Sequence, residues 1–120
     1  MTKKYFLLEV EKEIEHIKEN ATKEELNNLS YSQFDHDSTI SCLYGLLTGY
    51  CDSDRARKLN KKSFAFGFNE DNFKEALKSE EGNTFTHLEI YLFYCDDDTH
   101  KNIIDYLKGD VETLNKLKTK

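Results

Sequence analysis

Apolar side chains recur at helical spacing over residues 3–20, and this stripe constrains the fold more than any other feature of the sequence. Steps of three, four and three residues place its members on one face of an α-helix: Leu7, Val10, Ile14 and Ile17. The glutamates and lysines between them are expected on the solvated face. The pattern therefore predicts an amphipathic helix over 3–20.

Capping residues and glycine stops divide the following residues into shorter helices. Thr22 and Glu25 match a capping box, in which the Thr side chain caps an amide and the Glu reaches back. Gly49 can end a helix by taking a left-handed conformation. A short helix is expected from Thr22 through Leu29. A second helix is expected from a cap at Asp37 or Ser38 to Gly49, with a buried face made of Ile40, Leu43, Tyr44 and Leu47. A third is expected over 54–61, capped by Asp52 or Ser53. Residues 30–37 are polar and are predicted to form a loop.

Residues 85–95 allow two interpretations. Their aromatic and β-branched content favours a strand, whereas Thr86 and Glu89 match a second capping box and favour a helix. We favour a buried helix. Between 64 and 84 we expect a short strand or connector at 64–68, a helix over 69–77 and a loop at 79–84. A further helix is expected to start at a cap on Asp98 or Thr99 and to end at Gly109, and it carries Ile103, Ile104, Tyr106 and Leu107. A last short helix, capped by Asp110, is expected to contain Val111 and Leu114.

These elements predict a mainly α fold, a compact and irregular multi-helix bundle in a single globular domain, 1–120. One short β-hairpin near 64–68 is an option, and the alternative α+β fold requires 85–95 to be a strand. A length of 120 residues suits one domain that buries a sizeable core without metals or disulfides. The sequence contains no internal repeat and no recognisable domain linker.

Composition and charge exclude several classes of protein. No apolar run is long enough for a transmembrane helix, and three cysteines do not make a disulfide scaffold. The net charge of -6 is divided evenly between the two halves, which argues against a nucleic-acid ligand and leaves an acidic nucleic-acid mimic as a third alternative. Glutamates interrupt the signal-peptide-like start, so a cytoplasmic location and no membrane partner are expected.

Histidine, cysteine and carboxylate groupings give the candidate sites of chemistry. The weak candidates for metal binding, in two loop clusters, are Asp35, His36, Asp96 and His100. Helix caps and solvated histidines explain these clusters as well, so no metal and no cofactor are predicted. Cys42 and Cys51 lack a C-x-x-C pattern, and we interpret both as structural thiols rather than as a nucleophile paired with His36 or His87. No catalytic residue is assigned.

A basic stretch and surplus aromatic residues give a candidate partner surface. Residues 54–62 hold the main group of cations, and the chain has more Phe and Tyr than one helix face can hide. Aromatic residues and Arg are enriched at interface hot spots. The predicted partner-binding residues are Tyr44, Tyr50, Arg55, Arg57, Lys58 and Lys61. For Arg55 we favour a structural role, in which it bonds to helix-end carbonyls.

Two segments resemble a known group of proteins. Residues 42–56 match the pattern C-[I/L]-Y-G-x-x-T-G-x-C-x-S-x-R-A, and residues 85–114 match F-T-P-L-E-x-Y followed by I-I-x-Y-L-K-G, with His87 in place of the Pro. These patterns are similar to those of an uncharacterised group of small proteins from bacteriophages and their bacterial hosts. The resemblance implies a phage-linked cytoplasmic protein. Because the group has no established activity, it implies no catalytic residues.

The absence of a catalytic sequence pattern favours a non-enzymatic protein-interaction module with a protein partner. With the resemblance, we expect a phage-encoded factor that binds and inhibits a host defence protein, of which an anti-CRISPR protein is one example. The alternative is a small metal- or nucleotide-binding domain or hydrolase that uses the loop His and Asp residues and the turn between Cys42 and Cys51. The identity of the partner and a homo-oligomeric state stay open.

Overall fold

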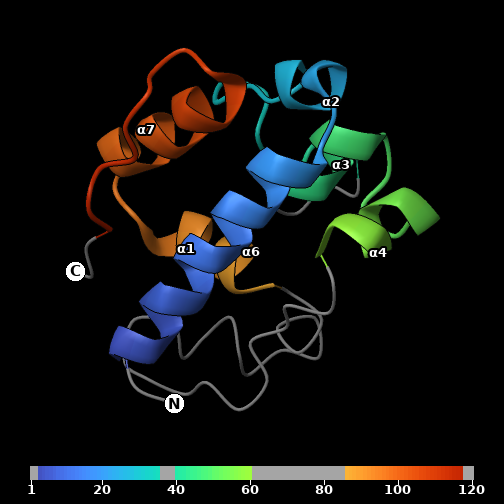
Figure 1. Ribbon diagram of the computed structural model, residues 1–120. Coiled ribbons are helices and arrows are strands. Elements are labelled where there is room, and N and C mark those ends of the chain that lie inside the picture. Colours follow the sequence, from blue (N-terminus) through green and yellow to red (C-terminus); the bar gives the residue numbers. More distant parts are fainter. Residues whose placement is uncertain (1–2, 36–39, 61–85, 118–120) are drawn as a thin grey trace.

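The computed structural model describes residues 3–35, 40–60 and 86–117, and within them the fold is helical and contains no strand. The helices, labelled as in Figure 1, are α1 (Lys3–Asn20), α2 (Lys23–Asn27), α3 (Leu43–Thr48), α4 (Asp54–Asn60), α6 (His87–Tyr94) and α7 (Asp97–Lys108). The mainly α prediction is confirmed. The elements expected at 64–68, 69–77 and 79–84 lie outside the described residues.

Helix α1 runs through the middle of the described bundle and packs most extensively against α6 (Figure 1). Four of its side chains are fully buried: Phe6, Val10, Ile14 and Ile17. Phe6 takes the place that the spacing gave to Leu7, which is only half-buried. Helices α4 and α7 also contact α1, so segments from both halves of the chain cover its apolar face.

Capping boxes start two of the helices. At α2, the Glu25 N–H donates to Thr22 Oγ1 at 3.1 Å, and the Thr22 N–H donates to Glu25 Oε1 at 2.8 Å. At α6, Thr86 and Glu89 make the same reciprocal bonds at 3.2 and 3.1 Å. Each box satisfies amides that a helix start otherwise leaves unpaired. The helical interpretation of residues 85–95 is confirmed and the strand alternative is wrong.

Helix α3 begins later than the sequence predicts. Its N-cap is Cys42, which makes no side-chain capping bond, so Ile40 lies before the helix and is 61 % exposed. The prediction of a buried Ile40 is therefore wrong, and the expected caps at 37–38 lie outside the described residues. Gly49 ends α3 with a φ of 95°, as predicted. Ser53 starts α4, because its Oγ accepts the Ala56 N–H at 3.1 Å.

Helix α7 is capped by Asp96, whose Oδ1 accepts the Thr99 N–H at 2.7 Å. The predicted caps, 98 and 99, instead lie in its first turns. Gly109 ends the helix in the left-handed conformation, with a φ of 84°. Every helix in the described residues is too short or too polar to cross a lipid bilayer.

Residues 110–117 form no helix, so the prediction of a last helix capped by Asp110 with Val111 and Leu114 is wrong. The Asp110 N–H bonds back to the Asp105 carbonyl and so completes the end of α7. The Asn115 N–H bonds to the Asn102 side chain at 2.8 Å. These partners satisfy backbone groups that a new helical turn would otherwise use.

Candidate functional site

Glu13 of α1 lies inside the core, although the sequence pattern predicts it on the solvated face. Its side chain is 3 % exposed, and it accepts hydrogen bonds from the Tyr44 hydroxyl at 2.7 Å and from the Leu88 N–H at 2.8 Å. These bonds join α1 to α3 and α6. The prediction is wrong because two buried donors, each from another helix, need this acceptor.

Burial raises the pKa of Glu13 to about 8. The hydrogen bonds with Thr86, Leu88 and Tyr44 lower this pKa, but their effect is smaller than that of burial. Glu13 is therefore mainly uncharged at neutral pH. Burial also raises the pKa of Glu89 in the α6 capping box. Tyr44 and Thr86 are almost completely buried, so a substrate has no access to this cluster. We interpret it as a structural link between helices.

Tyr44 cannot be part of a partner surface, because its side chain is only 1 % exposed. That prediction is wrong: the hydroxyl points to Glu13 in the core. The two thiols nearby are also poor candidates for chemistry. Burial raises the pKa of Cys42 to about 12 and raises that of Cys51 as well, so both remain protonated and weakly nucleophilic at neutral pH.

Arg55 of α4 is committed to an intramolecular contact. Its Nε and Nη2 donate to the two carboxylate oxygens of Glu25 at 2.8 and 2.7 Å, and Nη2 also donates to the Asn20 carbonyl at 3.0 Å. Such a two-pronged bond fixes α4 to the α1–α2 turn. The structural role that we favoured for Arg55 accounts for this geometry, and the binding role does not.

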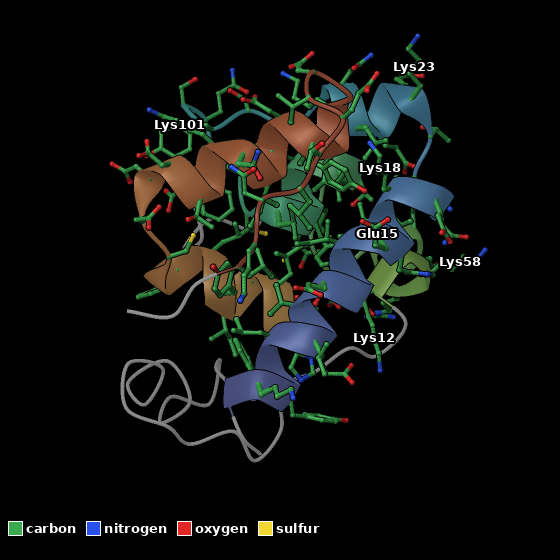
Figure 2. All side chains as sticks on the ribbon, turned by 60° about the vertical axis from the view of Figure 1, so that its left-hand side comes forward. Lys12, Glu15, Lys18, Lys23, Lys58 and Lys101 are labelled. Atoms are coloured by element: carbon green, nitrogen blue, oxygen red, sulfur yellow. The ribbon has the colours of Figure 1, made fainter. Side chains whose placement is uncertain are left out.

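The rest of the predicted basic surface is small in the described residues. Arg57 Nη2 lies 2.9 Å from Asp52 Oδ1, which neutralises much of its charge. Lys58 points outward from α4 (Figure 2), and Tyr50 is 47 % exposed. Lys61 lies outside the described residues. Of the predicted partner residues that the structure describes, Tyr50, Arg57 and Lys58 are exposed, and Arg57 is paired with Asp52.

The three metal candidates that the structure describes do not come together as ligands. No group of three or more His, Cys, Asp and Glu side chains with metal-binding geometry occurs in 3–35, 40–60 and 86–117. Asp35 is exposed, Asp96 caps α7, and His100 packs among aromatic rings. His36 lies outside the described residues.

A surface cavity of 310 Å³ lies where the segment after α2 meets α6 and α7. We call it the ring cavity, and its lining residues are Tyr31, Ser32, Phe34, Leu92 and His100. The sequence pattern does not predict this cavity, because the polar composition of 30–37 indicates only a loop. Two aromatic residues within that polar segment were the available signal.

Three rings make up most of the wall of the ring cavity. The His100 imidazole meets the Tyr31 ring edge to face at 4.9 Å and 87° between planes, and meets the Phe34 ring at 4.6 Å and 83°. His100 is 7 % exposed, and its Nε2 has no hydrogen-bond partner among the described residues. The Nε2 of His16 is buried in the same way, so an orphan imidazole nitrogen is not peculiar to the ring cavity, and the His100 atom itself is closed to solvent.

The charges around the ring cavity are mainly negative. Burial lowers the pKa of His100 to about 4, with Asp97 acting in the opposite direction, so the imidazole is neutral at pH 7. A hydrogen bond to the Asp97 carboxylate raises the pKa of Tyr31, and the charge of Asp98 adds to this effect. Lys101 is the cation placed against the cavity, with its Nζ 4.9 Å from the centre of the Tyr31 ring.

Comparison of the chain with protein-family models, with curated proteins and with solved structures finds no match, so the functional argument depends on the geometry described above.

Proposed function

We propose that the protein is a non-enzymatic protein-interaction module that receives a side chain of its partner in the ring cavity. The observation that supports this most is an accessible cavity with aromatic walls. Interface hot spots have this character, since a few aromatic residues surround one anchor side chain. The volume of 310 Å³ is at the small end of ligand pockets and suits one large side chain.

The ring cavity is a better contact site than the surface of α4. Arg55 and Arg57 already bond to carboxylates of the chain itself, and a partner would have to replace those bonds. The ring cavity instead offers an open hollow with aromatic walls, in which a side chain can bury apolar surface without displacing an arginine–carboxylate pair.

The specific form that we propose is a phage-encoded factor that binds and inhibits a host defence protein in the host cytoplasm. The support for this form is the resemblance of residues 42–56 and 85–114 to small phage and bacterial proteins. The ring cavity supports the binding role in general, whichever protein is bound.

A pull-down with matched variants tests the proposal. The tagged wild-type chain is incubated with nuclease-treated bacterial lysate, and captured proteins are identified by mass spectrometry. Ser32→Trp fills the ring cavity from an exposed position that lines it. Gln33→Trp makes the same change at an exposed neighbour that does not line the cavity. Thermal melts of the variants confirm that they fold.

We expect one stoichiometric partner with the wild-type chain and with Gln33→Trp, and loss of that partner with Ser32→Trp. A double charge reversal on α4, Arg57→Glu with Lys58→Glu, should retain the partner. The opposite pattern, with loss on α4 and retention after Ser32→Trp, would move the contact site to α4. If the folded wild-type chain captures no partner from a lysate of its native host, the proposal that the protein is an interaction module is wrong.

A further inference from the structure

We propose that the ring cavity recognises an arginine side chain in a basic segment of the partner. This inference rests on the proposed function and specifies the chemistry of the ligand. Two features of the cavity support it: the aromatic walls and the negative charges beside them.

The aromatic walls suit a flat cation. The faces of aromatic rings carry negative electrostatic potential, and a guanidinium stacks on them through both charge and shape. The Tyr31 ring already attracts one cation, because Lys101 Nζ lies 4.9 Å from its centre. Phe34 and His100 stand nearly perpendicular to each other, at 83°, and so present ring surfaces in two directions.

The polar groups of the cavity suit a ligand with several N–H donors. The Asp97 carboxylate bonds to the Tyr31 side chain and also influences His100. A guanidinium carries five N–H donors and no acceptor, so it can bond to that carboxylate while its flat face stacks on a ring of the cavity. The Nε2 of His100 is closed to solvent and takes no part in this contact.

Other ligands fit the cavity less well. A phosphate group would be repelled by Asp97 and Asp98 and by the net charge of -6. An aliphatic side chain would gain nothing from the Asp97 and Asp98 charges. A lysine ammonium would gain from the charges, but it is more strongly hydrated than a guanidinium and loses more on entering a small cavity.

Four synthetic peptides that differ only at a central residue test this inference. They carry Arg, Lys, citrulline or norleucine between two flanking lysines, and each is titrated into the full chain. Fluorescence anisotropy gives the dissociation constant, and two-dimensional NMR of the imidazole and aromatic signals gives the location. We expect the Arg peptide to bind most tightly. Citrulline, which keeps the shape of Arg without its charge, should weaken binding about 2- to 30-fold.

A charge-matched pair of variants tests the role of the acidic wall. Asp97→Asn should weaken binding of the Arg peptide by several fold, and Asp54→Asn should not. Asp54 is a suitable control because its side chain is 97 % exposed and lies on α4. The His100 and Tyr31 ring signals should shift with the Arg peptide in the wild-type chain and in Asp54→Asn.

Three results would overturn the inference: norleucine binding as tightly as Arg, equal effects of the two Asp variants, or no shift of the His100 signals at the highest soluble peptide concentration. The proposed function fails separately. If Ser32→Trp loses the partner but Arg is not preferred, the cavity is a contact site for another side chain. If Ser32→Trp keeps the partner, the cavity is not the contact site, whatever the peptides show.

Discussion

Glu13 brings an ionisable side chain into the hydrophobic core and gives the protein a pH dependence that an ordinary helix surface would lack. Its pKa is raised from 4.5 to about 8 by burial, so the folded chain holds a proton that the unfolded chain has released at neutral pH. A raised carboxyl pKa contributes stability that is complete below the unfolded pKa and is lost as the pH rises through the folded value.

We expect the free energy of unfolding to fall by about 2 kcal/mol between about pH 6.5 and 8.5, and Glu13→Gln to remove most of this fall. Glutamine resembles the protonated acid, so the variant should be nearly as stable as the wild type at the lower pH. Urea unfolding at several pH values measures the effect. The same change at the exposed Glu24 is the control. Parallel curves for wild type and Glu13→Gln would contradict the burial of a proton at this site.

His100 does not disturb this measurement. Its pKa is lowered to about 4, so the stability that it contributes is lost as the pH falls from about 6.5 through 4. The wild type and Glu13→Gln both contain His100, so this contribution cancels in their difference.

The sequence could not place these two residues. Glu13 differs from its neighbouring glutamates only in facing Tyr44 and Leu88, which lie on helices distant in the chain. His100 was noticed as a metal candidate, but its ring partners are in a segment predicted to be a polar loop. Helical spacing describes one face of one helix, and it carries no information about which neighbour faces it.

At the level of elements, Arg55 ties α4 to the turn between α1 and α2. The Arg55 side chain is 40 % exposed and that of Glu25 only 15 %, so the pair is more than an ordinary surface ion pair. The guanidinium holds the pKa of Glu25 down at about 2, below its usual 4.5. Stability from a lowered carboxyl pKa is present above the unfolded value and is lost as the pH falls.

Arg55→Lys is expected to destabilise the protein by about 1 kcal/mol, because lysine cannot bond to both oxygens of Glu25 and to the Asn20 carbonyl in this fixed geometry. Arg57→Lys, on the exposed pair with Asp52, should change stability by less than about 0.5 kcal/mol. Unfolding in urea, rather than in guanidinium chloride, measures the stability of both variants without adding salt. The Arg55→Lys deficit should shrink as the pH falls from about 4.5 towards 2. A deficit that is equal for both variants would contradict the linking role of Arg55.

Short sequence motifs predicted helix ends well where nearby residues supply the hydrogen bonds for the backbone at those ends. The boxes at Thr22 and Thr86 and the stops at Gly49 and Gly109 are complete within a few residues, and they stand as predicted. No helix follows Asp110 in the described residues, because the Asn115 N–H, which would bond to the Val111 carbonyl in a helix, bonds to the Asn102 side chain instead. A cap residue permits a helix, and tertiary partners decide whether one forms.

For the molecule as a whole, the described helices share one core cluster centred on α1 and α6. The segment after α7 lies at the edge of this core cluster. It is attached through the Leu117 side chain, which is 4 % exposed, and through the hydrogen bond from the Asn115 N–H to the Asn102 side chain. The ring cavity is also a property of the whole arrangement, because its walls come from a loop and two helices. Its position could not be predicted from any single stretch of sequence.

Hydrogen exchange should reflect this arrangement. We expect the amides of α6 and of the inner turns of α1 to exchange only when the whole protein unfolds, because both helices are buried around the Glu13 contact. The amides of 111–116 should exchange much faster through local opening. Exchange followed by NMR in neutral buffer gives both rates. Equal protection of α1 and 111–116 would contradict a core centred on the first helix.

The Leu88-to-Glu13 hydrogen bond spans 75 residues of chain. A ribosome that adds about 5–20 residues per second needs roughly 4–15 s to make that length, and α6 is not available to α1 during this time. The apolar face of α1 therefore leaves the ribosome well before the helix that covers it. Cells that make this protein must keep a newly made, uncovered helix soluble for several seconds, which is the situation in which chaperones bind nascent chains.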